Sequence, residues 1–483
     1  MDIWKKIAAL SKEHLGSDPP DQADFAEMSH EIFRPGDHAC PTQIEDSAQA
    51  NGDVEVLPEY TFLLKAIQEQ CPAVFVTGRA GTGKSTLIRF LTSQLPRVAV
   101  VAPTAIAAMN VSGTTIHSFF GIPHRAINPD EAFNPRKHMI PVVENLQALI
   151  IDEVSMVAPD LVDCISNTLM KVRRNDLPFG GVPVVFVGDL LQLPTVVADR
   201  DVGVYYTHRY ESPYFFSAEI FKRIRIFPLQ LKRVFRQADE EFIAALDKIR
   251  TNRAHRDAVA FFNRQCCSDS WRDDEQSICL VPTNAAAKSI NDQKLNALTT
   301  KMETYEALID GDVKIGRQRY PAPDLLHLKE GARVVFVKNN KPMWLNGTLG
   351  EVVNLKKKSI NVRLLSSGNI VPVSRETWAQ YRYHYNYEKQ KIEYEVVGSY
   401  SQFPLTLGWA ITIHKSQGMT FDHVRIDLGR GAFCTGQTYV ALSRCRSLDG
   451  ICLSRPIAMG DVKVDRTIIE FYERLGFLDE DQN

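Results

Sequence analysis

The sequence lacks long apolar runs and any strong charge of one sign. No apolar stretch approaches the ~20 residues of a membrane-spanning helix, and Met1 to Lys6 lack the apolar core of a secretory signal peptide. The 483 residues carry a net charge of −2, so the chain as a whole does not attract nucleic acid. Any nucleic-acid site must therefore be a local groove, with the excess acid elsewhere.

Cysteine is present without a pattern. The nine cysteines form no C-x-x-C pair and have no histidine partner at zinc spacing. Reduced thiols are the simpler interpretation, so we expect a cytoplasmic protein. The length predicts about three domains.

The most informative stretch is a glycine-rich loop between an apolar run, Ala73–Thr77, and a helical pattern, Thr86–Leu91. This order turns a G-x-x-x-x-G-K-[ST] string into a phosphate cradle, because backbone N–H groups and a helix N-terminus hold polyphosphate. We expect Lys84 to reach the β- and γ-phosphates and the Ser85 hydroxyl to ligate Mg²⁺. The residues expected to bind the nucleotide here are Gly78, Gly81, Thr82, Gly83, Lys84, Ser85 and Thr86.

The segment from Val54 to about Val197 reads as α/β. Its apolar runs are continuous rather than alternating, as in strands covered on both faces of a parallel sheet. Each run ends in a polar loop, where ligands of open α/β sheets bind. The runs are Ala73–Thr77, Val98–Ala102, Leu149–Asp152 and Val184–Val187.

Two of these loops carry candidate catalytic residues. Asp152 and Glu153 end the third run, where Asp152 would hold Mg²⁺ and Glu153 would polarise the attacking water. Gln192, just past the fourth run, is placed to hydrogen-bond the γ-phosphate or the water. Taken alone, the acids would be an exposed pair at a strand end, and the glutamine would lie in a turn.

Hydroxyl, histidine and aromatic side chains lie between these motifs. Thr104 and Ser118 can bond phosphates, while His117 and Phe119 can stack on or wedge between the bases of single-stranded nucleic acid. The alternative for this stretch is a core phenylalanine and a histidine satisfied within the fold.

The motifs, in this order, resemble the Pif-one family, five-prime to three-prime DNA helicases of superfamily one related to RecD. The likeness covers roughly residues 56 to 456, and its last three stretches resemble motifs IV, V and VI of that family. The stretches are Gly78–Ser85, Ala102–Ala108, Thr114–Phe120, Asp152–Met156, Phe179–Gly181, Gly188–Pro194, Leu231–Gln237, Gly408–Thr420 and Gly436–Arg444.

The resemblance implies an ATP-dependent DNA helicase that moves five-prime to three-prime on single-stranded DNA and unwinds duplex DNA by Mg-ATP hydrolysis. Single-stranded DNA and single/double-strand junctions would be its partners, and the protein would associate with the nucleoid if the source is bacterial. Arg236 and Arg444 would reach the nucleotide across a cleft, although either could instead be a structural ion-pair partner. Gly418 would bind the nucleotide, and His414 and Lys415 would bind DNA.

The second half is also strand-rich. The runs Ser277–Thr283, Leu405–Ile413, His423–Leu428 and Ile451–Ser454 predict a second parallel-sheet lobe. Between them, Asn346-Gly347 separates β-rich segments and predicts a hairpin. Short strands follow at Ile360–Leu365 and Ile370–Val373, so a small β-barrel is expected here.

The expected fold class is α/β, with two RecA-like P-loop NTPase lobes and a small β-barrel inserted in the second. The expected domains are a loosely ordered acidic segment at 1–55 with a short helix near Ile3–Leu15, a first lobe at 56–205 with a small insertion near 118–142, a second lobe at 206–300 and 403–470, the inserted barrel at 301–402, and a C-terminal tail at 471–483.

Two departures from the family pattern stand out. The family's adenine-reading glutamine has no counterpart near Leu57–Thr61, so the recognition of adenine is left open, and Thr195 replaces a usual second proline after Pro194.

Four alternatives remain open. A DNA-stimulated ATPase or translocase subunit without autonomous unwinding would keep the same motifs. A switch GTPase would need Asn-Lys-x-Asp, but Asn340-Lys341-Pro342 runs into Met343. A small-molecule kinase would not need motifs IV to VI, and a non-motor nucleic-acid-binding subunit would tolerate losses among the catalytic residues.

Overall fold

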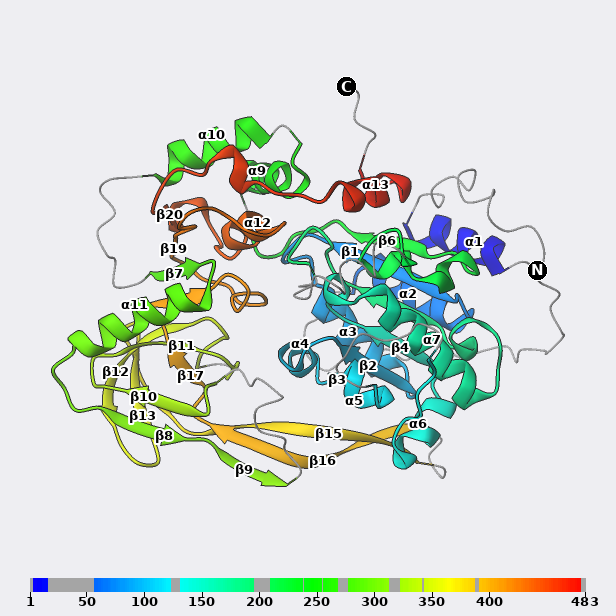
Figure 1. The fold of residues 1–483 in the computed structure, drawn as a ribbon, viewed down its shortest axis with the longest axis horizontal. Coiled ribbons are helices and arrows are strands. Elements are labelled where there is room, and N and C mark those ends of the chain that lie inside the picture. The colour runs from blue at the N-terminus through cyan, green and yellow to red at the C-terminus, as the bar shows by residue number, and fades with distance from the viewer. Residues whose placement is uncertain are drawn as a thin grey trace.

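The computed structural model describes residues 3–15, 56–122, 131–194, 209–237, 239–253, 255–267, 277–311, 322–340, 343–386 and 391–478. Two parallel sheets with their helices lie side by side, and antiparallel strands extend below them (Figure 1). Within the described ranges no helix is both long and apolar enough to cross a membrane. The cysteines in the same ranges are all free thiols.

The first sheet is parallel throughout and has the order β3-β2-β4-β5-β1-β6. Successive residues of β1 alternate between two apolar cores, with Phe75 on one face and Val74 and Val76 on the other. Burial on both faces explains the continuous apolar runs in the sequence. The strands are β1 Ala73–Gly78, β2 Val98–Ala102, β3 Thr114–Thr115, β4 Ala148–Ile151, β5 Val184–Val187 and β6 Phe227–Leu231.

Helices cover both faces of this sheet and connect its strands. The α-helices are α2 Pro58–Gln68, α3 Lys84–Gln94, α4 Ala105–Asn110, α5 Ile116–Phe120, α6 Ile140–Glu144 and α7 Pro159–Arg173. The 3-10 turns are η2 Lys137–Met139, η3 Val154–Met156, η4 Pro178–Gly181, η5 Phe215–Ser217 and η6 Glu219–Lys222.

The N-terminal helix α1, Ile3–Leu15, packs on α2, as the sequence predicts a helix there. Ile7 is buried in the same core as Phe62. Lys6 and Glu69 form an ion pair with 2.7 Å between Nζ and Oε2. The acidic segment that follows α1, residues 16–55, lies outside the described residues.

The second sheet is also parallel, with the order β18-β7-β19-β20, as the sequence predicts. Its strands are β7 Ile278–Val281, β18 Ala410–Thr412, β19 Val424–Ile426 and β20 Ile451–Leu453. The helices that accompany it are α9 Glu240–Thr251, α10 His255–Cys266, α11 Asn284–Ala297, α12 Gln437–Leu442, η7 Leu448–Gly450 and η8 Met459–Asp461. The last helix of the chain is α13, Arg466–Arg474.

Antiparallel strands fill the interruption of the second lobe. The hairpin expected at Asn346-Gly347 is present, since β11 pairs with β12 and Gly347 has a φ of +96°. One sheet has the order β14-β13-β12-β11-β17, β8 pairs with β10, and β9 pairs with the long hairpin β15–β16. The strands are β8 Glu303–Glu306, β9 Leu308–Gly311, β10 Leu325–Leu328, β11 Arg333–Phe336, β12 Leu349–Leu355, β13 Ile360–Leu364, β14 Ile370–Val373, β15 Glu376–Asn386, β16 Lys391–Gln402 and β17 Leu405–Leu407.

Three expected boundaries differ from the structure. The strand β6 falls in the segment expected to begin the second lobe, but it pairs with β1 in the first sheet. The run Leu405–Ile413 is two strands, because Gly408 packs against the backbone of Val334 and divides β17 from β18. The helix α13 packs on the core of the first lobe and crosses back from the second (Figure 1).

Candidate nucleotide site and nucleic-acid interface

The phosphate loop joins the end of β1 to the start of α3. Gly81 and Gly83 have φ values of +83° and +88°, a left-handed conformation that glycine adopts without strain. A Cβ at Gly81 would lie 2.5 Å from the Cβ of Arg236, so packing also excludes a side chain there. Because Gly83 is the N-cap of α3, the loop leads to a helix N-terminus, the arrangement that suits an anion.

Three further side chains, those of Thr82, Ser85 and Thr86, occupy or flank this loop. The buried Thr82 hydroxyl donates to the Arg79 carbonyl oxygen at 3.0 Å, and a Cβ at Gly78 would lie 2.4 Å from the Thr82 oxygen. Ser85 is exposed at the start of α3. The Thr86 hydroxyl accepts a 3.2 Å hydrogen bond from Arg89.

The Lys84 ammonium lies over the loop. It donates to the carbonyl oxygens of Gly78 and Arg79 at 2.7 and 3.0 Å. Burial lowers the pKa of this ammonium, and Asp189, Glu153 and Asp152 act in the opposite direction. Lys84 is thus held where a polyphosphate in the loop would exchange carbonyl partners for phosphate oxygens.

The two acids after β4 are crowded. Asp152 is 8% exposed, and burial together with the neighbouring Glu153 raises its pKa to about 7. Burial also raises the pKa of Glu153, although Lys84 and Arg444 favour its charged form. Glu153 has a φ of +49°, an uncommon conformation that turns the chain sharply after the strand. A nearby cation would relieve this crowding of carboxylates.

Gln192 belongs to a rigid loop after β5. Its amide nitrogen donates to Asp189 at 3.2 Å, and the same carboxylate accepts from the Leu191 backbone N–H at 3.2 Å. Asp189 in turn forms a buried ion pair with Arg250 of α9. Gln192 is therefore oriented through a residue of the second lobe.

The segment after β6 and the end of α12 place two arginines beside the phosphate loop. Arg236 packs on Gly81, while its guanidinium donates to the Ser443 carbonyl oxygen at 3.1 Å. Arg444 is 2% exposed and donates to the Val440 carbonyl oxygen at 3.0 Å.

Charges on both sides of the lobe boundary act on these guanidinium groups. Burial, then the neighbouring Arg236, lowers the pKa of Arg444 to about 9, against the opposing effects of Tyr439, Glu153 and Asp189. Burial also lowers the pKa of Arg236. Arg236 thus lies against the phosphate loop, and Arg444 lies within electrostatic reach of Glu153.

Two contacts at this loop were not predicted from the sequence. The Tyr439 hydroxyl accepts from the Ala80 backbone N–H at 3.0 Å. The guanidinium of Arg79 pairs with Asp247 of α9 at 3.0 Å. Tyr439 lies inside the stretch that resembles motif VI, so its position was a usable signal, whereas Asp247 follows no motif.

An exposed aromatic residue also lies beside the loop. The ring of Phe235 is 3.6 Å from the position of a Cβ on Gly83, and the residue is 48% exposed. Arg233 lies over this ring, 4.8 Å from its centroid. On the other side, the Tyr60 hydroxyl donates to the Gly83 carbonyl oxygen at 3.1 Å.

The four residues of the first lobe that were expected to bind nucleic acid differ in their exposure and contacts. Ser118 is exposed and His117 half-buried, with His117 Nδ1 3.3 Å from the Ile122 carbonyl oxygen. The Thr104 hydroxyl caps α4 by accepting from Ala107 at 3.2 Å. The stacking role expected for Phe119 is wrong, because this residue is 1% exposed in the core of the first lobe.

The candidates of the second lobe lie on a turn after β18. Lys415 and Gly418 are exposed, and a Cβ at Gly418 would lie 3.6 Å from the Asn110 side chain across the lobe boundary. The half-buried His414 ring is stacked on Phe433, with 6.1 Å between centroids and 14° between planes. Phe433 is 57% exposed, and no sequence pattern singled it out.

A phosphate loop on one parallel-sheet lobe, approached by arginines of a second lobe, defines the two-lobed class of P-loop proteins. A family model described as PIF1-like helicase matches residues 60–257. The ATP-dependent DNA helicase Pif1 of Bdellovibrio bacteriovorus is 30% identical over 433 residues, which cover 87% of this chain and 92% of that protein. The chain belongs to the PIF1-like helicase family, which confirms the resemblance seen in the sequence.

Other relatives agree with this assignment. The human ATP-dependent DNA helicase PIF1 is 34% identical over 416 residues, and the match spans 83% of this chain but 61% of the human protein. Pif1 from Bacteroides sp in complex with ADP-AlF4 is 36% identical with a TM-score of 0.81, covering 88% of this chain and 99% of that chain. The same relative bound to ssDNA has a TM-score of 0.64 at 36% identity, with 87% and 97% covered.

Proposed function

We propose that this chain is an ATP-dependent DNA helicase that moves five-prime to three-prime on single-stranded DNA and unwinds duplex DNA. The observation that carries the proposal is the meeting of both lobes on the phosphate loop, through Tyr439 on Ala80 and Arg236 on Gly81. A motor needs such a shared site, because a nucleotide can move two lobes only if it binds their closed and open arrangements differently.

The residues of the first lobe would bind Mg-ATP. Backbone N–H groups of the loop and Lys84 would hold the phosphates, and the exposed Ser85 hydroxyl and Asp152 would hold Mg²⁺. The raised pKa of Asp152 supports this role, since a divalent cation would favour the charged carboxylate. Glu153 would accept a proton from the attacking water and orient it.

The second lobe would stabilise the charge that develops on the γ-phosphate. Arg236 and Arg444 now donate to carbonyl oxygens of their own surroundings, and phosphate oxygens would replace these partners. Gln192, held by Asp189, would hydrogen-bond the γ-phosphate or the water. Gly418 lies beside Asn110 of the first lobe, and closure of the cleft would bring it to the nucleotide.

The aromatic ring of Phe235 would hold the base of the nucleotide. A base attached to phosphates at Gly83 would lie near this exposed ring, and stacking on it needs no glutamine upstream of the loop. The upstream position is filled by Tyr60, which contacts the Gly83 backbone instead.

Single-stranded DNA would bind to Thr104, His117 and Ser118 of the first lobe. His414 and Lys415 would complete this path, with Lys415 on phosphate. The relative from Bacteroides sp bound to ssDNA supports DNA as the partner. A structure that describes DNA unwinding at forked dsDNA by two coordinating Pif1 helicases, 36% identical to this chain, supports single/double-strand junctions as a partner.

We also propose that the antiparallel strands form the small barrel expected near 301–402. The strands β8 and β10 share one apolar core with the five-stranded sheet, and Tyr305, Leu326, Val334 and Leu405 all belong to it. The remaining division into lobes follows the sequence, with β6 moved to the first lobe and α13 packed on it.

Unwinding of duplexes with a single tail tests this function. We expect ATP-dependent unwinding of a duplex with a five-prime single-stranded tail and none with a three-prime tail only. ATP hydrolysis should rise strongly when oligo-dT is added. A DNA-stimulated rate without unwinding of either duplex would favour the translocase subunit, and a DNA-independent rate would contradict a DNA motor.

A further inference from the structure

The C-terminal helix α13 belongs to the second lobe by sequence and to the first by packing. Ile468, Phe471 and Tyr472 are buried in the core of the first lobe, and Phe471 is stacked on Phe216 with 4.0 Å between centroids. In Figure 1 this helix lies over the first sheet, apart from α10, which covers the second.

One side chain of α13 reaches the nucleotide loops. The Tyr472 hydroxyl lies 2.7 Å from the Thr77 hydroxyl and accepts from the Leu190 backbone N–H at 3.2 Å. Thr77 directly precedes the phosphate loop, and Leu190 lies two residues before Gln192. One buried oxygen therefore joins the loop expected to hold the phosphates to the loop expected to sense the γ-phosphate.

The ring of Tyr472 supports the same loop through a second contact. The Arg250 guanidinium lies 5.6 Å from the ring centroid. Arg250 donates to both carboxylate oxygens of Asp189, at 2.8 and 3.3 Å, and Asp189 accepts from Gln192. The hydroxyl of Tyr472 thus contacts the loop that carries Gln192. Its ring contacts Arg250, the ion-pair partner of Asp189 in that loop.

We propose that Tyr472 is a positioning residue for ATP hydrolysis, which sets the spacing between Thr77 and Leu190 so that Gln192 meets the γ-phosphate in the transition state. This inference rests on the ATPase activity proposed above. Because the hydroxyl touches neither Gly83 nor Lys84, its loss should leave the binding of the β-phosphate intact and weaken contacts made in the transition state.

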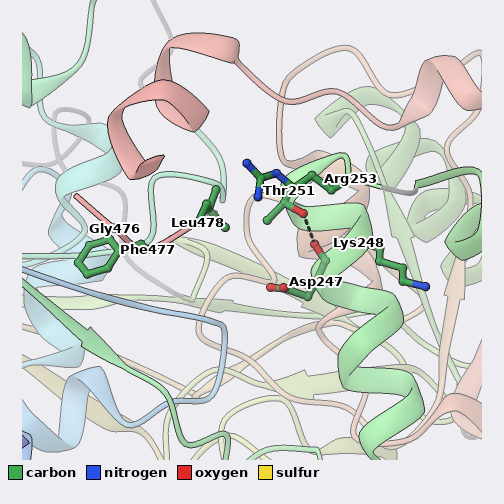
Figure 2. A pocket seen from close by; sticks show the side chains of 7 residues that line it. All are labelled: Asp247, Lys248, Thr251, Arg253, Gly476, Phe477 and Leu478. Atoms are coloured by element: carbon green, nitrogen blue, oxygen red, sulfur yellow. Dashed lines mark hydrogen bonds between the residues drawn. The ribbon is translucent and has the colours of Figure 1, made fainter. Parts of the chain in front are cut away.

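A cavity lies beside the contact between α9 and the end of α13. Its volume is about 400 Å³, with Asp247 and Thr251 on the side of α9 and Phe477 and Leu478 on the other (Figure 2). The Arg253 guanidinium after α9 and the Glu473 carboxylate of α13 form an ion pair beside this cavity, so the two elements are joined there. The positioning role of Tyr472 therefore rests on its own contacts with Thr77 and Leu190.

A second tyrosine provides a matched control. The Tyr214 hydroxyl donates to Asp465, the N-cap residue of α13, at 2.6 Å. It anchors the same helix to the same lobe but touches no nucleotide loop. Tyr214→Phe and Tyr472→Phe therefore each remove one hydroxyl from the α13 contact, and only the second removes one from the site.

The experiment compares ADP binding, binding of ADP with aluminium fluoride, and oligo-dT-stimulated ATP hydrolysis in the full chain. For Tyr472→Phe we expect kcat to fall about tenfold and the complex with aluminium fluoride to weaken about tenfold, with the affinity for ADP changed less than about twofold. For Tyr214→Phe we expect all three values to stay within about twofold of the unchanged protein, with a similar loss of thermal stability.

Two results would overturn the proposal. One is an equal kcat and equal nucleotide affinities in the two variants; the other is an equal loss of affinity for ADP and for ADP with aluminium fluoride in Tyr472→Phe. If Tyr472→Phe does not fold, Thr77→Val and Thr77→Ser provide the same test, because valine removes the hydroxyl that meets Tyr472 and serine keeps it. Thr77→Val should then lose the aluminium fluoride complex selectively, and Thr77→Ser should retain it. An unchanged protein without ATPase activity would instead refute the function on which the inference rests.

Discussion

The Asp189 carboxylate and the Arg250 guanidinium form a buried ion pair, with 2.8 Å between Oδ1 and Nη2. Asp189 follows β5 in the first lobe, and Arg250 lies near the end of α9 in the second. Burial alone would raise the pKa of Asp189, but the charge and hydrogen bonds of Arg250 outweigh it and hold the pKa below its usual range. The pair therefore joins the lobes behind the phosphate loop as a charged unit.

Breaking this pair should be strongly destabilising. Asp189→Ala leaves the buried guanidinium with only the more distant Asp247 carboxylate, at 3.7 Å, so we expect the free energy of unfolding in urea to fall by about 3 kcal/mol. The double variant Asp189→Leu with Arg250→Met should recover most of this loss. As a control, Glu470→Ala removes the exposed pair with Arg466 and should change stability by less than about 1 kcal/mol.

The same pair fixes a pH dependence. A carboxyl whose pKa is lowered in the folded state contributes stability above its unfolded pKa of about 3.9 and loses it as the pH falls through the folded value. The stability difference between the unchanged protein and Asp189→Asn should thus be constant from pH 5 to pH 8 and shrink only in stronger acid. A difference that shrinks near neutral pH would contradict the lowered pKa.

Replacing Lys84 should separate hydrolysis from DNA binding. Lys84→Ala removes the cation over the phosphate loop, so we expect kcat for ATP to fall by about 10³ or more. Binding of oligo-dT, followed by fluorescence anisotropy, should change less than about twofold, since the lysine contacts only loop carbonyls here. Lys171→Ala, a surface change on α7, serves as control. Equal loss of both activities in Lys84→Ala would refute the assigned role.

Replacing Arg444 should lower the ATPase activity without lowering the stability of the fold. Burial lowers the pKa of Arg444 to about 9, so the fold carries a charged group at a cost. Arg444→Met, of similar volume, should leave the melting temperature unchanged or raise it, while kcat falls by about 10³. Differential scanning fluorimetry and a steady-state assay measure the two effects. A large loss of stability with little loss of activity would make Arg444 a structural residue.

The ring of Phe235 should affect nucleotide binding more than turnover. Phe235→Ala removes the stacking surface, so we expect KM for ATP to rise about tenfold with kcat changed less than about threefold. Phe235→Trp should restore the low KM. The exposed Phe433→Ala, far from the phosphate loop in sequence, gives a comparison of equal chemistry. An unchanged KM in Phe235→Ala would remove the proposed base contact.

His414 should make DNA binding depend on pH. Burial lowers the pKa of His414, so it is neutral in the free protein at pH 7, and a neighbouring phosphate would favour its protonated form. Affinity for oligo-dT at fixed salt should therefore rise as the pH falls toward 5.5, by about threefold more than in His414→Gln. Because protonation of a buried histidine also costs folding free energy below its unfolded pKa, the melting temperature is followed at each pH.

The exposed His327→Gln is the control for this titration and should follow the unchanged protein. Parallel pH profiles for the unchanged protein and His414→Gln would place His414 outside the DNA path.

Much of the fold follows from local pattern. The apolar runs before Gly78 and Asp152 were located from the sequence because a strand buried on both faces leaves a continuous apolar signature. The phosphate loop has its own signature, since its positive φ values require glycine at positions 81 and 83. Asn346-Gly347 predicted its hairpin because the turn needs a positive φ, which Gly347 adopts.

The tertiary structure alone decided which distant residues meet. Arg250, Asp247 and Tyr472 follow no motif, because their partners Asp189, Arg79 and Thr77 lie far away in the chain and no short-range pattern records such pairs. Packing likewise decided that Phe119 faces the core, since residue type and spacing fit a core residue and a base-stacking residue equally well. The sequence determined the chemistry of the phosphate loop, and the packing of the two lobes and α13 determined what surrounds it.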